Sequence, residues 1–237
     1  MNITVLTTET DHHTWYVREL KKAFPSTRAI IETNHLKPTF DTFHSFENAR
    51  KEFELKSFFK NQKCQIFDFV DGIVVDTINS YEVIHYVKKN SNDIYISFGV
   101  GKISPDIINM SKEKIINLHG GLPEKYRGLD SHLWAIYHND FSSLVTTLHS
   151  LSSDLDSGDI ILKESLSFPK GTNLYELRYY NTLSCLRLTL VALDMYARFQ
   201  YFIKTSQSSQ GRYYSFMPGV LKEICVKKFE KYTGKYE

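Results

Sequence analysis

The chain has 237 residues, of which 42% are hydrophobic and 24% are charged, as is ordinary for a globular protein with a sizeable core. Its formal net charge of +2 is far from the concentrated positive charge that binding to a nucleic acid backbone requires, so we exclude nucleic acid as its main partner. The chain does not open with a basic segment and an apolar run, and no apolar stretch reaches the roughly 18 residues of a membrane span. We therefore expect a cytoplasmic protein without a membrane partner.

Short β-branched runs alternate with helical patterns from residue 3 to residue 119. Strands are expected at 3–7, 29–32, 73–76, 94–98 and 115–119, with helices between them, including one over roughly 45–60 and one near 81–89. This alternation is typical of βαβ units. The sequence therefore predicts an α/β fold with a doubly wound, mostly parallel, Rossmann-like sheet.

The pattern changes in the second half of the chain. Apolar runs at 144–149 and 160–168 are expected to extend the sheet, and Asn173 with Glu176 forms a capping-box pattern that opens a long helix towards Lys204. Further on, runs at 213–217 and 224–229 flank Pro218-Gly219 and predict a C-terminal β-hairpin. We expect a catalytic domain at 1–205 and a hairpin extension at 206–237, packed either on its own domain or on a second copy in a homodimer.

Asn117 and His119 lie two residues apart at the end of an expected strand and therefore point to the same face of the sheet. In an open parallel sheet, ligands collect at the carboxyl ends of the strands. An amide beside an imidazole at that place suits acyl transfer, because Asn117 can stabilise an oxyanion while His119 moves a proton. From the spacing alone, a structural Asn-His pair is the alternative.

A carboxylate-rich loop at 154–159 lies between two apolar runs and can bring Asp156 to the imidazole, where it would fix the tautomer; a solvated turn is the alternative. No pair of histidines has metal-site spacing with a suitable carboxylate, so we expect no metal. The loop after the first strand lacks the G-x-G-x-x-G pattern of dinucleotide sites. Three cysteines lie far apart and predict no disulfide: Cys64, Cys185 and Cys225.

Two separated motifs resemble those of the folate-dependent formyltransferases. Residues 117–128, NLHGGLPEKYRG, are similar to the family's N-x-H…L-P-x-Y-R-G signature, and His149 with residues 154–160, DLDSGDI, is similar to its H…x-L-D-x-G-D-I segment. The resemblance implies that Asn117, His119 and Asp156 are catalytic and that N10-formyltetrahydrofolate is the co-substrate. It also implies that two loops hold the folate through Phe98, Gly99, Val100, Gly101, Lys102, Ser152 and Asp154.

Within this family, residues 126–138, the opening segment at 7–13 and the segment at 213–218 resemble nucleotide-sugar N-formyltransferases, above all those acting on dTDP-4-amino-4,6-dideoxyglucose for surface polysaccharide such as O-antigen. The acceptor implied is a nucleotide-linked amino sugar. Gly120-Gly121 departs from the commoner family pattern and leaves the identity of the acceptor open. The candidate residues for binding the acceptor are His12, His13, Asn79, Ser80, Tyr126 and Arg127; for the loops at 8–13 and 77–81, ordinary turns are the alternative.

Besides a hydrolase that would cleave the formyl donor and release formate without an amine, three other functions compete with this interpretation. One is a purine-pathway formyltransferase, against which the missing glycine-rich phosphate loop argues. Another is a methionyl-tRNA formyltransferase, for which the near-balanced charge and the short segment after the long helix are unfavourable. The third is a folate-binding module without turnover, which has no need for the three catalytic residues.

Overall fold

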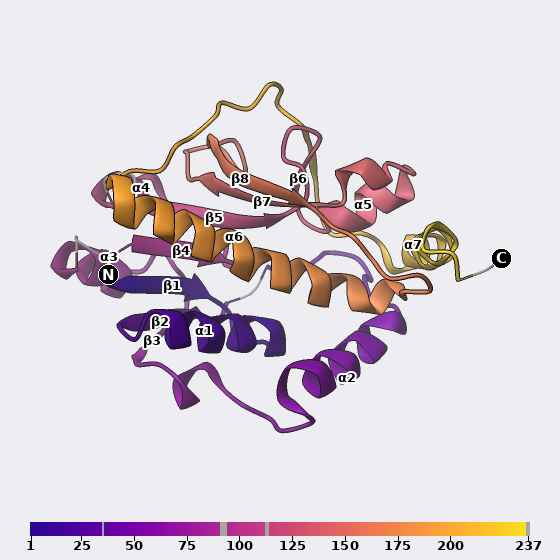
Figure 1. Ribbon diagram of the computed structural model, residues 1–237, viewed down its shortest axis with the longest axis horizontal. Helices are drawn as coiled ribbons and strands as arrows, with labels where there is room; N and C mark the ends of the chain where they lie inside the picture. The colour runs from indigo at the N-terminus through magenta and orange to yellow at the C-terminus, as the bar shows by residue number, and fades with distance from the viewer. Residues whose placement is uncertain (35, 91–93, 112–113, 236–237) are drawn as a thin grey trace.

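A seven-stranded sheet forms the centre of the computed structural model, which describes residues 1–34, 36–90, 94–111 and 114–235 (Figure 1). Its strand order is β3-β2-β1-β4-β5-β7-β8. The first five strands pair in parallel, and β7 and β8 extend the sheet in antiparallel pairs, so the predicted mostly parallel α/β fold is confirmed. The strands are β1 (Ile3–Thr7), β2 (Thr27–Glu32), β3 (Gly72–Val75), β4 (Ile94–Phe98), β5 (Ile115–Gly120), β7 (Val145–Ser150) and β8 (Ile160–Ser165).

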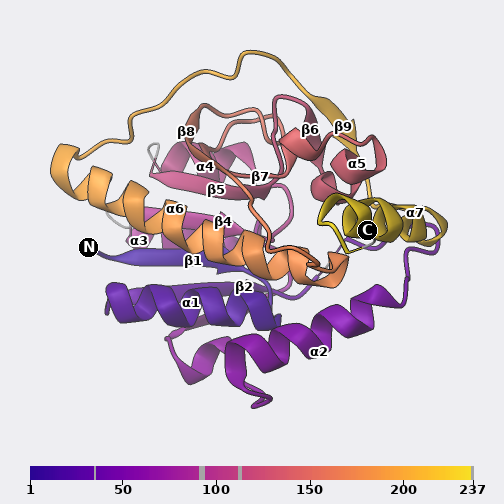
Figure 2. The same ribbon diagram turned by 45° about the vertical axis from the view of Figure 1, so that its right-hand side comes forward.

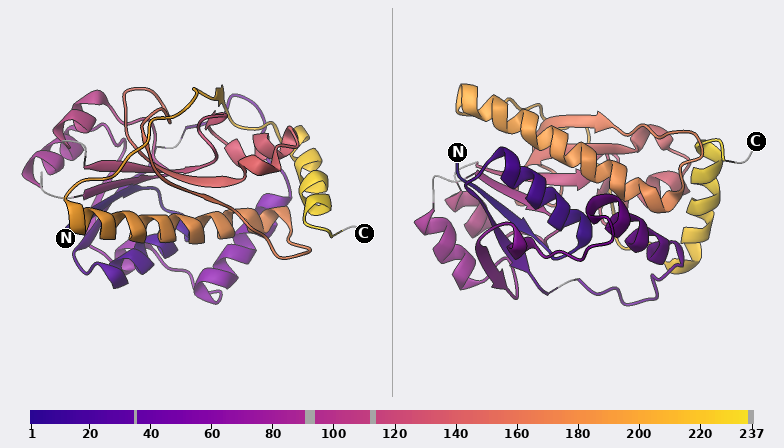
Figure 3. Two further views of the ribbon diagram at one scale, coloured as in Figure 1. Left: turned by 45° about the horizontal axis from the view of Figure 1, so that its top comes forward. Right: turned by 60° about the horizontal axis from the view of Figure 1, so that its bottom comes forward.

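Helices cover both faces of the sheet, as the alternation of strands and helices predicts. On one face lie α1 (Asp11–Ala23), α2 (Phe46–Phe59) and the long α6 (Leu177–Phe199), seen side by side in the right-hand view of Figure 3. On the other face lie α3 (Tyr81–Lys89) and α4 (Pro105–Met110). Neighbouring side chains of a strand serve opposite cores: Val5 packs with α1 and α6, whereas Leu6 packs with α3 and α4.

The start of α6 follows the capping box that the sequence predicts. The backbone N–H of Asn173 donates to the Glu176 carboxylate at 3.0 Å, and a 3-10 helix at Leu174–Glu176 leads directly into α6. The helix ends at Phe199 rather than at Lys204, because Gln200 takes a left-handed conformation with φ of 63°. Other 3-10 helices lie at Ile66–Asp68 and Phe141–Ser143.

The predicted C-terminal β-hairpin is wrong. Residues 200–211 arch over the sheet, and β9 (Arg212–Tyr214) pairs in parallel with β6 (Tyr126–Gly128) in a small second sheet (Figures 1 and 2). The last element is a helix, α7 (Gly219–Tyr232), which packs beside α5 (Ser131–Tyr137). The hairpin through which we expected a homodimer contact is therefore not formed by residues 213–229.

A helical period accounts for this difference. Leu221, Cys225 and Phe229 recur every fourth residue, which places them on one helix face, and the last two are fully buried. Pro218 stands at the N-cap and the helix begins at Gly219, so Pro218-Gly219 starts a helix instead of turning a hairpin. This face joins residues of α5 and the start of α6 in a third apolar cluster.

Candidate active site

Asn117 and His119 lie at the carboxyl end of β5, on the same side of the strand, as predicted. Leu118 between them points into the core and is 5% exposed. The antiparallel neighbour β7 places His149 directly opposite Asn117 and Thr147 opposite His119. The two strand ends thus bring two imidazoles and one amide together.

His149 orients the amide of Asn117. The Nδ1 atom of His149 lies 2.8 Å from the carbonyl oxygen of Ser150, which only accepts, so Nδ1 carries the ring proton. The bare Nε2 atom then accepts an N–H from Asn117 Nδ2 at 3.1 Å. This bond leaves the second N–H of the Asn117 amide free to stabilise an oxyanion.

Asp156 reaches both imidazoles from the loop after β7. Its Oδ1 atom lies 3.6 Å from His119 Nδ1 and 3.6 Å from His149 Nε2, while its Oδ2 atom accepts the backbone N–H of Gly128 at 2.8 Å. Asp156 has a φ of 53°, in the left-handed region that aspartate tolerates better than most residues. A solvated turn, the alternative considered for this loop, does not describe a side chain that is 6% exposed.

The hydrogen bonds of His119 show where the ring can take up a proton. Its Nε2 atom lies 3.0 Å from the carbonyl oxygen of Tyr126 and must donate an N–H to it. The neutral ring therefore presents a bare Nδ1 to the Asp156 carboxylate. A proton taken up at Nδ1 creates an imidazolium that Asp156 stabilises directly.

The charge of Asp156 is favoured by its surroundings. Burial by itself would raise its pKa, but attraction to the protonated forms of His119 and His149 and the bond from the Gly128 N–H together hold it well below the ordinary value. Asp156 is consequently an anion over the whole neutral and mildly acidic range. It is suited to support a positive ring and unsuited to donate a proton.

Two cavities meet at His119. The first, of about 160 Å³, is lined by the loop at 99–103 and the loop at 151–156, together with Asn117. The second, of about 240 Å³, lies between α2, α5 and the start of α6. His119, Gly128 and Leu129 line both cavities, whereas Asn117 and Asp156 line only the first. The His119 ring therefore lies between two separate spaces.

The residues expected to bind folate line the first cavity, with one exception. The exception is Phe98, which is 6% exposed and packs edge-on against His13 and Tyr16. Gly99 has a φ of 84°, and a Cβ atom there would lie 2.4 Å from His13, so only glycine fits this loop. The residues that do line the cavity are Gly99, Val100, Gly101, Lys102, Ser152 and Asp154.

The residues expected to bind the acceptor lie outside the linings of these two cavities. His12 and His13 are buried against Phe98. The Asn79 side chain bonds Lys102 O and Ser104 N, and Ser80 precedes α3. Contact of these residues with an acceptor stays a prediction.

Two of these residues hold the site together. Arg127 donates to the carbonyl oxygens of Gly211 at 2.6 Å and Leu155 at 3.3 Å, which ties the C-terminal segment to the Asp156 loop. Tyr126 supplies the carbonyl that orients His119. Arg127 therefore acts through the backbone of other segments, whereas Tyr126 acts through its own backbone carbonyl.

Three features of the site go beyond the catalytic set expected from the sequence. His149 was marked only by its place in the second motif, and the structure adds its bond to Asn117. Gly128 ends the first motif, but no sequence pattern indicates that its backbone N–H donates to Asp156. The basic wall of the second cavity, formed by Arg50 and Arg178, comes from helices whose residues show no motif.

Among the described residues, no group of three or more histidines, cysteines or carboxylates is arranged to hold a metal ion. Within the same part of the chain, no helix combines the length and apolarity needed to cross a membrane.

Curated relatives match less than half of the chain. The chain is 33% identical over 117 residues to the bifunctional polymyxin resistance protein ArnA of Wigglesworthia glossinidia brevipalpis, and 37% identical over 97 residues to the methionyl-tRNA formyltransferase of Clostridium tetani. These alignments cover 48% and 40% of this chain. They span only 18% and 31% of the two relatives' own lengths.

Solved structures share the fold at low identity. A 4-N formyltransferase from Francisella tularensis has a TM-score of 0.60 and 18% identity, covering 90% of this chain and 76% of its own. An N-formyltransferase from Helicobacter canadensis, solved with folinic acid and dTDP-3-aminofucose, has a TM-score of 0.60 and 15% identity, covering 91% of this chain and 71% of its own. At these identities the similarity shows a shared fold and nothing more.

The match to a family model extends well beyond the two motifs. The model described as formyl transferase matches residues 2–177, which span the whole parallel sheet, both motifs and β7 and β8. The resemblance expected from the motifs is thereby confirmed, and the chain belongs to the formyl transferase family.

Proposed function

We propose that this protein transfers the formyl group of N10-formyltetrahydrofolate to the amine of a nucleotide-linked amino sugar. The observation that carries the proposal is the position of His119 where two cavities meet, with Asn117 and Asp156 beside it on the wall of the first cavity. A transferase needs its donor and acceptor on opposite sides of the same catalytic groups, within bonding distance of each other. The arrangement supports transfer over simple binding of folate.

The first cavity suits the folate. Gly99 and Gly101 leave bare backbone along one wall, against which a flat ring can lie. The Glu32 carboxylate holds this loop by accepting the N–H of Gly101 at 2.7 Å and that of Ile78 at 2.7 Å. The formyl group would then lie at the end of the cavity that Asn117 lines.

The reaction follows from the hydrogen bonds of the site. The acceptor amine attacks the formyl carbon, a C–N bond forms, and the carbonyl oxygen becomes an oxyanion that the free N–H of Asn117 stabilises. The amine's proton moves to His119 Nδ1, and Asp156 stabilises the imidazolium. The bond between the formyl carbon and N10 then breaks, and the proton passes from His119 to N10, which leaves tetrahydrofolate.

Two lines of support favour an amino sugar as acceptor. The segment 126–138 resembles nucleotide-sugar N-formyltransferases, and proteins of the same fold include the Helicobacter canadensis N-formyltransferase solved with dTDP-3-aminofucose. We propose dTDP-4-amino-4,6-dideoxyglucose, used for surface polysaccharide such as O-antigen, as the first compound to test. The 37% identity to a methionyl-tRNA formyltransferase makes charged initiator tRNA the second candidate acceptor.

The test is an incubation of the purified protein with N10-formyltetrahydrofolate and separate amines, followed by mass spectrometry for the gain of one formyl group. The amines are dTDP-linked 3-amino and 4-amino sugars, glycinamide ribonucleotide and charged initiator tRNA. Formylation of a dTDP-linked sugar supports the proposal and identifies the position of the amine. An Asn117→Ala variant serves as the control for background transfer.

Other outcomes refute different parts of the proposal. Formylation of the tRNA or of the purine precursor alone keeps formyl transfer and overturns the acceptor. Release of formate without an acceptor indicates a hydrolase. Tight folate binding with no reaction on any amine indicates a binding module.

A further inference from the structure

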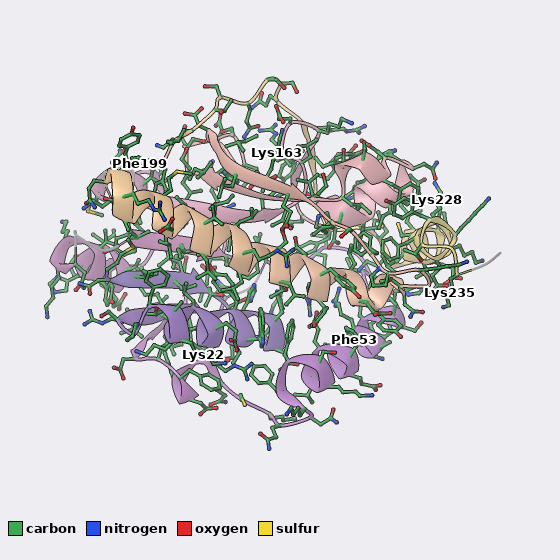
Figure 4. All side chains as sticks on the ribbon, in the orientation of Figure 1. Lys22, Phe53, Lys163, Phe199, Lys228 and Lys235 are labelled. Atoms are coloured by element: carbon green, nitrogen blue, oxygen red, sulfur yellow. The ribbon has the colours of Figure 1, made fainter. Side chains whose placement is uncertain are left out.

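A basic wall borders the second cavity, on the side of His119 that faces away from the folate loops. Two arginines contribute to it, Arg50 from α2 and Arg178 from the start of α6. The helices dock through aromatic rings: Phe53, labelled on α2 in Figure 4, lies 5.5 Å from the Tyr179 ring. This contact fixes α2 beside α6 and with it the position of Arg50.

The two arginines differ in what they already bind. Arg178 donates two bonds to the Glu54 carboxylate, at 2.6 and 2.5 Å, and Glu54 is 1% exposed, so this pair is complete. The Nε atom of Arg50 is buried and has no hydrogen-bond partner. Within the described residues, no carboxylate lies at ion-pair distance from Arg50, whose Cζ atom lies 5.6 Å from the Phe46 ring centre.

Three carboxylates act on the charge of Arg50, and each of them binds another group. Glu54 pairs with Arg178, Glu47 pairs with Lys222 at 2.6 Å, and Asp130 accepts the N–H of Met217 at 2.8 Å. A buried donor with no partner costs about 1–3 kcal/mol, so proteins rarely keep one without a use. The Arg50 guanidinium therefore lies on the wall of the second cavity with a donor that has no partner among the described residues.

Burial and neighbouring positive groups lower the pKa values of Arg50 and His12. Burial first, and then Arg178, lower the pKa of Arg50 to about 10, so its guanidinium is still positive at neutral pH. Burial also lowers the pKa of His12 well below its ordinary value, and Arg178, His13 and Arg50 lower it further. An anion in the second cavity would lie close to the Arg50 guanidinium, whose charge Glu54, Glu47 and Asp130 offset in part.

We propose that Arg50 binds an acidic group of the acceptor, the phosphate attached to the amino sugar, and thereby places the amine at His119. The inference rests on the proposed function and identifies the part of the acceptor that is recognised here. Arg50 and His119 line the same cavity, so one acceptor can contact both. The planar guanidinium matches a phosphate through two N–H groups, which sets orientation as well as affinity.

The test compares acceptors with and without the acidic group. Wild type, Arg50→Met and Arg50→Lys are assayed with the best dTDP-linked amino sugar and with the same amino sugar lacking the nucleotide. Arg198→Met is the matched control, because the Arg198 side chain is 69% exposed and pairs with Asp194 near the end of α6. Binding of dTDP alone is measured by titration calorimetry, which requires no turnover.

We expect Arg50→Met to lower kcat/KM for the nucleotide sugar by about tenfold to a hundredfold, as expected for a lost hydrogen bond to a charged group. The kcat/KM for the amino sugar without its nucleotide and the KM for N10-formyltetrahydrofolate should stay unchanged. Binding of dTDP should weaken. Arg50→Lys should recover part of the loss, because it restores the charge without the planar fork. Arg198→Met should behave as wild type.

Several results would overturn the inference. An equal loss of kcat/KM with the nucleotide sugar and with the amino sugar that lacks the nucleotide indicates a structural role for Arg50. A large fall in melting temperature indicates the same. A rise in the KM for folate alone places the anion in the donor. If the wild type formylates a dTDP sugar and Arg50→Met keeps the same preference, only this inference fails; if the wild type formylates no nucleotide sugar, the proposed acceptor fails and the inference with it.

Discussion

Lowering the pH should destabilise the protein through His132, a buried histidine of α5. Its Nε2–H donates to the carbonyl oxygen of Val145 at 2.8 Å. Burial lowers the pKa of His132 to about 4, with a smaller contribution from His119 in the same direction and an opposing one from the bond to Val145. In the unfolded chain the pKa returns to about 6.5.

The sign follows from which state binds the proton. Below about pH 6.5 the unfolded chain takes up a proton at this residue while the folded protein does not, so stability falls as the pH falls and levels off below about pH 4. At 1.36 kcal/mol for each pKa unit, the loss from His132 reaches about 2 kcal/mol at pH 5 and about 3 kcal/mol at pH 4. This is a substantial share of the stability of an ordinary domain.

Urea unfolding at pH 7.5, 6, 5 and 4 measures the effect, with His132→Gln as the matched variant. Glutamine does not titrate, and its side-chain amide can still donate to Val145. Buried His12, whose pKa burial also lowers, contributes equally to both proteins and cancels in the comparison. Wild type should lose about 2 kcal/mol more than the variant between pH 7.5 and pH 5. Parallel pH profiles for the two proteins would refute the reasoning.

Three further predictions concern the catalytic centre and its support. Asn117→Ala should lower turnover by about a hundredfold or more with an unchanged urea midpoint, because it removes the oxyanion donor; near wild-type turnover would contradict this role. Asp156→Asn should keep the bond from the Gly128 N–H but lose the charge that supports the His119 imidazolium, and turnover measured under saturating folate should fall by at least about a hundredfold; a change in KM alone would argue against it. Arg178→Met should cost about 3–5 kcal/mol of stability, because it leaves Glu54 buried and unpaired, and the double variant with Glu54→Gln should recover part of that loss in thermal unfolding; full additivity would show that the pair is not coupled.

The parallel part of the fold was predictable because its signals are local. Strand β4 is a short β-branched and aromatic run, and α2 was expected over nearly the residues that it occupies. The face shared by Asn117 and His119 follows from the two-residue period of a strand. Each of these predictions needs only neighbouring residues.

The C-terminal segment shows where local signals were ambiguous. Ile224 to Phe229 is apolar enough for a strand, yet the burial of Cys225 and Phe229 belongs to a helix face that packs on α5. Pro218-Gly219 is compatible with a turn and with a helix start. Only the packing partner decides between them, and the partner lies far away in the sequence.

By itself, the sequence determined the α/β class, the strand ends at which we propose the chemistry and, through two motifs, the family. The tertiary structure alone decided that His149 orients Asn117, that the Gly128 N–H holds Asp156, and that Arg50 faces the cavity behind His119. The first set depends on short periods and spacings within single segments. The second depends on the register of β5 against β7 and on the docking of α2 beside α6, contacts between distant segments that exist only once the chain has closed around its core.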